Sequence, residues 1–218
     1  MHRTDPQKAA FTLIELLIVV AIIAILAAIA VPNFLEAQAR AKVAHSMAGM
    51  RSLATAVEAY MADCGGYPLY GHIRASGELQ YPATDNIDGV NDQMSFIGSC
   101  ITTPVAYVTA FFEDPFARKL AVAGSSATPE GNELIRKIEY INLDQHVANF
   151  GASLPAFAPQ LIPAWGHWRM VAAGPDGDRG QDIKLNKVYD ATNGTVSDGD
   201  IVRCQRYSES RYNPEHPM

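Results

Sequence analysis

An uninterrupted apolar run near the N-terminus constrains this chain more than any other feature. Between Thr12 and Val31 every residue is apolar except Thr12 itself and Glu15. A helix of this length, rising about 1.5 Å per residue, covers about 30 Å, which is the thickness of the hydrocarbon core of a bilayer. The run therefore predicts a helix that can cross a membrane.

This run is longer than the apolar core of a secretory signal peptide, which spans about 7–15 residues and ends at a small-residue cleavage site. It also leads through Pro32 into further helix-like sequence. Before the run, Arg3 and Lys8 outweigh Asp5, which favours a cytoplasmic N-terminus. Taken by itself, the segment indicates an uncleaved single-pass anchor with the rest of the chain outside.

Glu15 is the one carboxylate in the apolar run. A charged side chain at the centre of a membrane span costs about 2.5–3.5 kcal/mol, and less near the interface, so such residues are usually paired or reach water. If the chain were cut between Ala10 and Phe11, the new amino group of Phe11 would lie one helical turn from Glu15. It could also pair with Glu15 of a neighbouring chain. The alternative is a Glu15 side chain that extends to water at the interface.

The stretch AFTLIELLIVVAIIAILAAIAVPNF, residues 10–34, closely resembles the N-terminal helix of type IV pilins and of the pseudopilins of type II secretion. Among these it is most similar to the major pseudopilin. The family motif is a short basic leader, a Gly before the cut, Phe-Thr-Leu-Ile-Glu, and a long apolar run with a Pro near its end. By this match Phe11 is the first mature residue, Glu15 the fifth and Pro32 the twenty-second. Ala10 stands where the family has Gly.

The resemblance implies that a prepilin peptidase cuts between Ala10 and Phe11 and methylates the new amine of Phe11. It also implies a structural subunit in the inner membrane, with a cytoplasmic N-terminus and a periplasmic body. Inner-membrane assembly machinery would then draw the subunit into a helical filament of identical copies. In that filament the Glu15 carboxylate would pair with the Phe11 amine of a neighbouring subunit. Because the pair neutralises the buried charge only when the two subunits are correctly offset along the filament axis, it would determine that offset.

After Pro32 the apolar pattern becomes periodic, with steps of three and four residues that indicate one stripe of an amphipathic helix. The stripe consists of Val43, Met47, Met50, Leu53, Ala54, Val57, Tyr60 and Met61, and the opposite face carries Arg40, Lys42, Ser46, Arg51 and Glu58. The Gly and Pro residues in 63–68 should end the helix. The sequence therefore predicts one helix from about Phe11 to Ala62. Pro32, which lacks an N–H, should kink or loosen it.

The rest of the chain predicts short strands and long connections. Residues 65–100 are rich in turn-forming types without a sustained period, and we expect a long connection there. Residues 100–116 predict a short helix capped near Thr102 or Thr103, with Pro104 at its first position. Residues 121–133 are expected to form a loop. Strands are expected at 133–143, 166–174 and 201–207, with another in 183–190.

These elements predict an α+β fold, in which a long N-terminal helix packs on a small antiparallel β-sheet with a C-terminal loop region. The helix consists of a membrane-spanning half and an amphipathic half. The expected division is a leader peptide at 1–10, a transmembrane and filament-core helix at 11–32, an amphipathic helix at 33–63 and an extracytoplasmic pilin-like domain at 64–218.

Two acidic, Gly-rich stretches lie near the C-terminus, at 174–182 and 189–201. Short carboxylates on flexible turns suit a hard cation such as calcium, although Asp-Gly pairs also form plain β-turns. The first stretch begins like an EF-hand loop and then fails, because Gln181 replaces the turn Gly and Lys187 replaces the bidentate Glu. On local chemistry alone, the two stretches could form either a cation site or simple β-turns.

The resemblance to major pseudopilins adds a C-terminal calcium loop, with Gly-x-Asp-Gly after a strand and a later Asp-x-Asp-Ile. Here these are residues 174–177 and 198–201, separated by a longer insertion than in the family. The resemblance thus implies calcium as a cofactor, with Asp176, Asp198 and Asp200 as ligands.

Net charge and cysteine content limit which partners and which cysteine bonds we expect. A formal net charge of -6 argues against nucleic acid as a partner, because phosphate binding needs clustered Lys and Arg. The three cysteines form no metal-binding spacing. If the body is exported, Cys64 and Cys100 could pair in a disulfide and leave Cys204 free.

Two further function classes compete with a filament subunit. For an anchored extracytoplasmic enzyme, the sequence shows no histidine pair at metal-ligand spacing, no G-x-S-x-G motif and no cysteine in a known nucleophile setting, so we expect no enzyme. A binding protein on an uncleaved anchor is the other alternative. Within the filament class, the calcium-like loop favours a type II secretion pseudopilus. The alternative there is a type IV surface pilus for adhesion, DNA uptake or motility.

Overall fold

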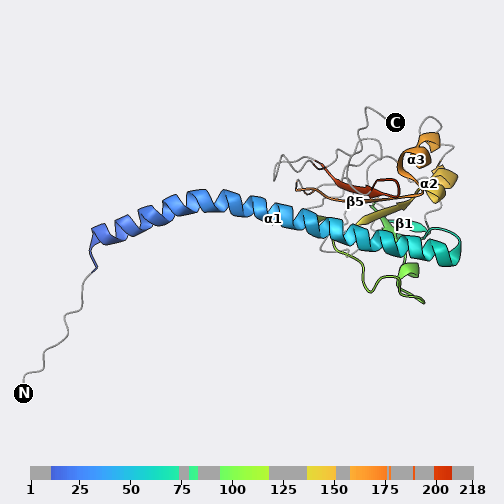
Figure 1. The fold of residues 1–218 in the computed structure, drawn as a ribbon, viewed down its shortest axis with the longest axis horizontal. Coiled ribbons are helices and arrows are strands. Elements are labelled where there is room, and N and C mark those ends of the chain that lie inside the picture. Colours follow the sequence, from blue (N-terminus) through green and yellow to red (C-terminus); the bar gives the residue numbers. More distant parts are fainter. Residues whose placement is uncertain are drawn as a thin grey trace, which may run out of the picture. The chain divides into compact units, whose positions relative to one another are not determined.

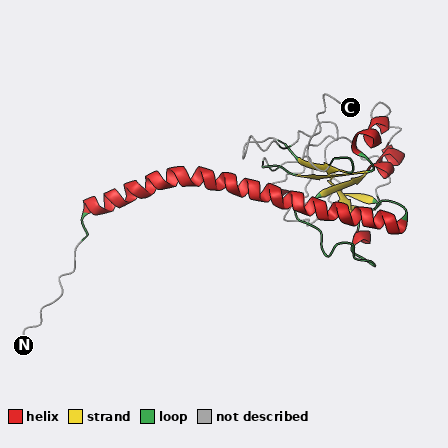
Figure 2. Cartoon of the chain, in the orientation of Figure 1, coloured by secondary structure: helices red, strands yellow, loops and turns green. Residues whose placement is uncertain are grey.

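The computed structural model describes residues 11–73, 79–82, 94–117, 137–150, 158–175, 177, 189 and 199–207. In chain order the elements are α1 (Leu13–Cys64), β1 (Tyr70–Ile73), β2 (Leu79–Gln80), β3 (Met94–Ile97), the 3-10 helix η1 (Ser99–Ile101), β4 (Glu139–Asn142), α2 (Leu143–Phe150), α3 (Ala158–Trp165), β5 (Trp168–Ala172) and β6 (Ile201–Cys204) (Figures 1 and 2). The chain divides into two compact units, 1–38 and 39–218.

The first unit contains the N-terminal part of α1, and its large apolar side chains from Leu13 to Leu35 are exposed. An 18-residue window of α1 has a mean hydropathy of 3.1 with none of it buried. By length and composition, α1 can cross a membrane, as the apolar run predicts. Pro32 lies inside α1, and the kink expected there stays a prediction.

In the second unit, one face of α1 is buried. Its buried residues are Ala39, Val43, Ser46, Gly49, Met50, Leu53, Ala54, Ala56 and Val57. The predicted stripe is confirmed at its centre, since Met50 and Val57 are almost completely buried. Ser46, assigned to the solvent face, is buried instead, because the stripe of three- and four-residue steps passes through it. Glu58, assigned to the same face, is half-buried.

Six strands form two three-stranded antiparallel sheets, with the orders β2-β1-β3 and β4-β5-β6. In the second sheet, Tyr140 of β4 and Arg203 of β6 lie opposite Met170 of the central strand β5. β3 lies close to β4, and α2 packs against α3 and touches β4 and β5. The α+β fold with a long helix and small antiparallel sheets is therefore confirmed.

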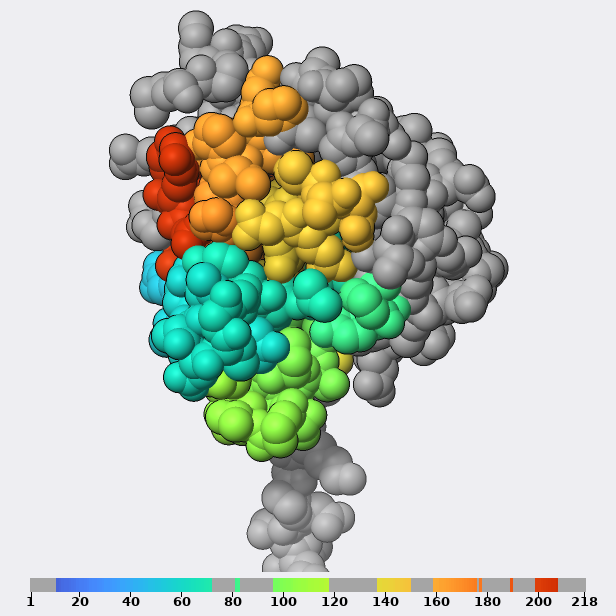
Figure 3. Space-filling model, turned by 90° about the vertical axis from the view of Figure 1, so that its right-hand side faces the viewer, coloured from blue at the N-terminus to red at the C-terminus, as the bar shows by residue number. Residues whose placement is uncertain are grey.

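The core of the body fills the space between α1 and the strands. Every residue of β5 is buried, and because successive strand residues point to opposite faces, both faces of that strand are covered. Figure 3 shows the residues at the end of α1 in teal, between 94–117 in light green and the segments 137–150 in yellow and 158–175 in orange, with 199–207 in red. The largest fully buried side chains include Trp165, Tyr70, Tyr140, Met50 and Met170.

The expected long connection at 65–100 was wrong, because it contains β1, β2 and β3. Tyr70 lies opposite Ile97 and Ile73 opposite Met94. Strands of two to four residues show too little alternation to be recognised, and their partners are set by pairing between distant segments.

The helix expected at 100–116 was also wrong. The carbonyl of Ser99 accepts the N–H groups of Thr102 and Thr103, and that of Ile101 accepts those of Tyr107 and Val108, so turns satisfy this backbone. Two β-branched threonines before a proline disfavour helix, and the completely buried Ile101 anchors the turns to the core.

Strands were confirmed at β4, β5 and β6, within the predicted ranges. The first ends earlier than expected because α2 begins at Leu143. The Asn142 side-chain oxygen accepts the N–H of Gln145 at 3.1 Å, which is the bond of a helix N-cap. The expected loop at 121–133, the first residues of the strand predicted from 133, and the expected strand at 183–190 apart from Tyr189 lie outside the described residues.

Candidate functional site

The N-terminal motif opens α1 with a capping box. Glu15 Oε2 accepts the backbone N–H of Thr12 at 2.8 Å and its hydroxyl at 2.6 Å. In return, Thr12 Oγ1 accepts the N–H of Glu15 at 3.3 Å. These bonds satisfy helix-start donors that have no partner inside the helix. The carboxylate therefore has a partner in its own chain, which the sequence interpretation missed although Thr-x-x-Glu is the signature of such a box.

The cap leaves Glu15 with capacity for another donor. An ionised carboxylate offers about four lone-pair sites, and both bonds to Thr12 use the same oxygen. Glu15 and the neighbouring Phe11 are both exposed. The arrangement can thus accept an ammonium group while the helix start stays capped. Ala10 lies outside the described residues, and the cut before Phe11, its methylation and its pairing with Glu15 stay predictions.

The predicted calcium loop begins and ends at the same end of the second sheet, where β5 ends and β6 begins. Ala172 lies opposite Ile201, so the turn at 174–177 leaves β5 where Asp200 enters β6. That turn is closed by the Gly177 N–H, which bonds to the Gly174 carbonyl at 3.0 Å. Antiparallel pairing therefore places the start of the first acidic stretch at the same end of the sheet as the last residues of the second.

Of the three predicted calcium ligands, the structure describes only Asp200. The side chain of Asp200 is buried, with 2% exposed, and a carboxylate in such a place needs hydrogen bonds or a positive partner. The Asp200 carbonyl accepts the N–H of Tyr189 at 2.8 Å. Asp176 and Asp198 lie outside the described residues, and among the described ones no group of three metal-ligating side chains occurs. Calcium binding stays a prediction.

Asp114 binds the backbone just before this loop begins, and the sequence interpretation missed it. Its Oδ2 accepts the N–H of Ala173 at 2.7 Å and its Oδ1 that of Phe116 at 3.0 Å. The side chain is buried. Asp114, in the last turn of the helix expected at 100–116, therefore fixes the chain where it leaves β5.

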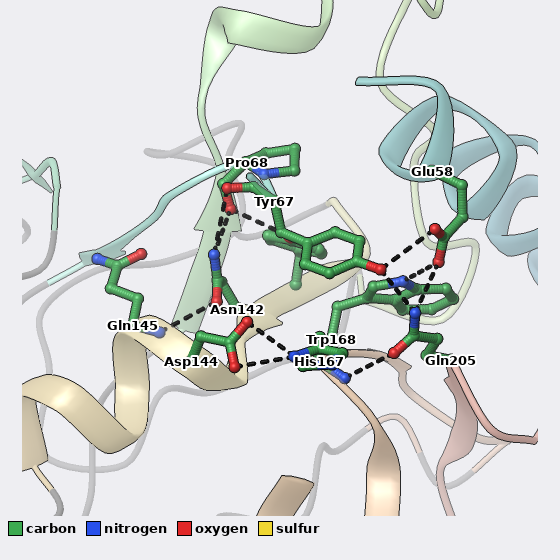
Figure 4. A network of polar contacts seen from close by, with 10 residues as sticks. Glu58, Tyr67, Pro68, Asn142, Asp144, Gln145, His167, Trp168 and Gln205 are labelled. Carbon is green, nitrogen blue, oxygen red and sulfur yellow. Dashed lines mark hydrogen bonds and ion pairs between the residues drawn. The ribbon is translucent and has the colours of Figure 1, made fainter. Parts of the chain in front are cut away.

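A polar network joins the end of α1 to the second sheet (Figure 4). Glu58 Oε1 accepts the indole N–H of Trp168 at 2.7 Å and an amide N–H of Gln205 at 3.3 Å. Its Oε2 accepts the hydroxyl of Tyr67 at 3.2 Å. Burial, together with the charge of Glu58, raises the pKa of Tyr67, so this hydroxyl remains a donor at neutral pH. The carboxylate thus serves three donors from separate parts of the chain.

The network continues to β4 and α2. Asn142 Nδ2 donates to the carbonyl oxygens of Tyr67 at 3.3 Å and Pro68 at 3.2 Å. His167, which precedes β5, stacks on Tyr67 with ring centroids 5.6 Å apart and pairs with Asp144 at 2.9 Å. Among the described residues no hydroxyl or thiol bonds to the ring of His167.

All three cysteines are free thiols in the structure. The disulfide between Cys64 and Cys100 stays a prediction, and the ring contact of Tyr60 with Tyr107 places the end of α1 beside the segment that follows Cys100. The Tyr60 hydroxyl interacts with the side chains of Cys64 and Cys100. Cys204 is buried on β6.

The N-terminal motif matches a known family model, and several known proteins are similar to part of this chain. A family model described as a prokaryotic N-terminal methylation motif matches residues 6–31. The type IV major pilin protein PilA of Myxococcus xanthus is 48% identical over 63 residues, covering 29% of this chain and 29% of its own length. A fimbrial protein of Pseudomonas aeruginosa is 35% identical over 103 residues, covering 40% of this chain and 67% of its own length.

The type II secretion system core protein G of Pseudomonas aeruginosa is also similar, with 39% identity over 62 residues, 28% of this chain and 44% of its own length. No solved structure gave a significant match. The alignments with PilA and with protein G thus cover less than half of either relative's length.

Proposed function

This chain belongs to the type IV pilin family and is a pilin-like subunit of a type IV pilus or of a type II secretion pseudopilus, and from that premise we propose that its filament is the secretion pseudopilus. The observation that carries the proposal is the arrangement at one end of the second sheet, where β5 ends and β6 begins. There the turn at 174–177 and the buried Asp200 meet across paired strands. A calcium loop of the kind that the resemblance to major pseudopilins implies would connect these two points.

The N-terminal part of α1 supplies the assembly element. Its apolar side chains are exposed, so they need lipid before assembly and other copies of the helix afterwards. The prepilin peptidase would release the amine of Phe11 and methylate it. Glu15, held at the helix start by Thr12, would bind that amine in a neighbouring copy, and the ion pair would offset the cost of the buried carboxylate. The subunit itself would await assembly in the inner membrane, its body periplasmic.

The second candidate is a type IV surface pilus. It is favoured by the relatives that are named pilin or fimbrial protein, one of which aligns over 67% of its length. Both candidates share the same leader, helix and assembly element. They differ in whether the filament stays within the envelope and drives secretion or extends from the cell.

Deleting the encoding gene in its host separates the two candidates. For a pseudopilus, proteins normally exported should accumulate in the periplasm, while surface fibres seen by electron microscopy remain. Loss of long surface fibres with secretion intact would identify a surface pilus. Mass spectrometry of the mature subunit should find a methylated Phe11 at the N-terminus, whereas an intact Met1 would indicate an uncleaved anchor.

A further inference from the structure

The end of α1 and the helix η1 place two thiols beside one hydroxyl. Cys64 is the last residue of α1, and Cys100 lies in η1, which follows β3. Tyr60 lies one helical turn before Cys64, and its hydroxyl interacts with both thiols. The N–H of Tyr107, whose ring packs against that of Tyr60, bonds to the carbonyl of Ile101, next to Cys100. Segments that are distant in the sequence therefore present both cysteines to the same small space.

Aromatic side chains hold this space in place. The ring of Tyr60 packs edge-on against that of Tyr107, with centroids 5.6 Å apart. The Tyr107 hydroxyl donates to Asp63 Oδ2 at 2.9 Å, next to Cys64. On the other side of Cys100, the Tyr81 hydroxyl lies 3.9 Å from the Cys100 sulfur. These contacts hold the end of α1 against the segment that carries η1.

We propose that Cys64 and Cys100 form an intramolecular disulfide when the body of the protein is in an oxidising compartment. The bond would join the end of α1 to η1 and close the segment 65–99, which contains the sheet β2-β1-β3. Periplasmic and other extracytoplasmic compartments allow such bonds to form and persist. The inference holds for either kind of filament, so its outcome is separate from that of the proposed function.

The reaction is a thiol–disulfide exchange with a disulfide oxidant. Cys64 is exposed, so its thiolate can attack the oxidant and form a mixed disulfide, releasing one oxidant thiol. Burial raises the pKa of the half-buried Cys100, which suits it to act second. Its sulfur then attacks Cys64, the protein disulfide forms and the second oxidant thiol leaves. The protein loses two protons and two electrons, and the oxidant is reduced to two thiols.

Cys204 is an internal control for the proposed disulfide. It is buried on β6, and its sulfur accepts the N–H of Tyr207 at 3.2 Å. The charged groups that act on it are Arg169 and Arg203. It is therefore placed among different neighbours from those of Cys64 and Cys100, and we expect it to stay a free thiol.

The test uses the full-length protein, purified fully reduced in detergent micelles and then treated with oxidised glutathione. Titratable thiols should fall from the three present when reduced to one, and the intact mass should fall by two hydrogen atoms. Peptide mapping should find Cys64 linked to Cys100. The melting temperature should rise, because the cross-link restricts the unfolded chain. Protein taken from the host envelope, with thiols alkylated at lysis, should already carry the bond.

Cys64→Ser and Cys100→Ser should each prevent the bond, and Cys204→Ser should leave it intact. Because Cys64 is exposed, reduced Cys64→Ser should melt like the reduced wild type, which separates loss of the bond from loss of the fold. Lasting glutathione adducts on Cys64, dimers linked between chains, a bond to Cys204 or three thiols that resist oxidation would each overturn the proposal.

Discussion

At the scale of single residues, Glu15 has two tasks. Its carboxylate completes the capping box with Thr12, and in the proposed filament it also receives the amine of Phe11 from a neighbour. The first task needs only a hydrogen-bond acceptor, which a glutamine also provides. The second needs a negative charge. Substitution can therefore separate the two.

We predict that Glu15→Gln and Glu15→Val both insert into the membrane and both fail to assemble. Glu15→Gln keeps the acceptor for Thr12, so its failure would isolate the role of the charge. Filament yield after shearing or by electron microscopy, with membrane fractionation as the control for insertion, measures the effect. Normal filaments from Glu15→Gln would contradict the ion-pair argument.

His146 should make the stability of the body dependent on pH. Its Nδ1 lies 2.8 Å from the hydroxyl of Tyr70, and burial, with a smaller contribution from Arg169, lowers its pKa from 6.5 to about 4. Because the folded pKa lies below the unfolded one, the unfolded chain takes up the proton first as the pH falls. The contribution is fully present above pH 6.5 and is lost on the way down to about pH 4. The loss should be about 3 kcal/mol.

Urea unfolding of the wild type and of His146→Gln at matched pH values measures this effect. The variant should lose less stability than the wild type between neutral and acid pH, while carboxylates titrate equally in both. Thr55→Ala, at an exposed residue without a titratable group, is the control and should retain the wild-type slope. Parallel curves for wild type and His146→Gln would show that His146 is not responsible.

At the scale of elements, the junction between α1 and the second sheet depends on Glu58. The stripe of α1 provides apolar contact, which is non-directional, whereas the three donors on Glu58 specify one position of the helix end. Trp168 is buried, so its indole N–H depends on the carboxylate for a partner. A buried donor without a partner costs about 1–3 kcal/mol.

Glu58→Ala should therefore lower the free energy of unfolding by about 1–3 kcal/mol. Combining it with Trp168→Phe should cost less than the sum of the single changes, because the second change removes the orphaned donor. Thr55→Ala, at an exposed residue whose hydroxyl bonds within the helix to the Arg51 carbonyl, should change stability by no more than about 0.5 kcal/mol. Urea unfolding measures the wild type, the two single variants, their combination and Thr55→Ala, and additive losses would argue against the network.

At the scale of the whole molecule, the two units place different demands on their surroundings. The first exposes an apolar helix, which needs lipid or other subunits. The second encloses a core of its own and carries the connection between β5 and β6. A cation bound there would stabilise the folded body, since it binds that state and not the unfolded chain.

We predict that removing calcium from the full-length protein in detergent lowers its melting temperature, and that calcium but not magnesium restores it, because magnesium requires tighter octahedral geometry. Asp200→Asn should abolish the response. Asp144→Asn, whose carboxylate pairs with His167 outside the loop, should keep it. Identical melting of the wild type with calcium and with chelator would exclude the site.

The features that the sequence by itself determined are those carried within one segment. The apolar run, the N-terminal motif and the stripe through Met50 and Val57 each have a period or a pattern of their own, and the structure contains the helix that they predict. The strands around Tyr140, Met170 and Val202 were recognisable for the same reason.

Only the tertiary structure decided which distant residues meet. The first sheet, the donors on Glu58, the anchor at Asp114 and the common neighbour of Cys64 and Cys100 all join segments that no local pattern relates. The physical reason is that a hydrogen bond or a thiol pair depends on the position of its partner in space. Local propensity and periodicity specify each element but not its neighbours.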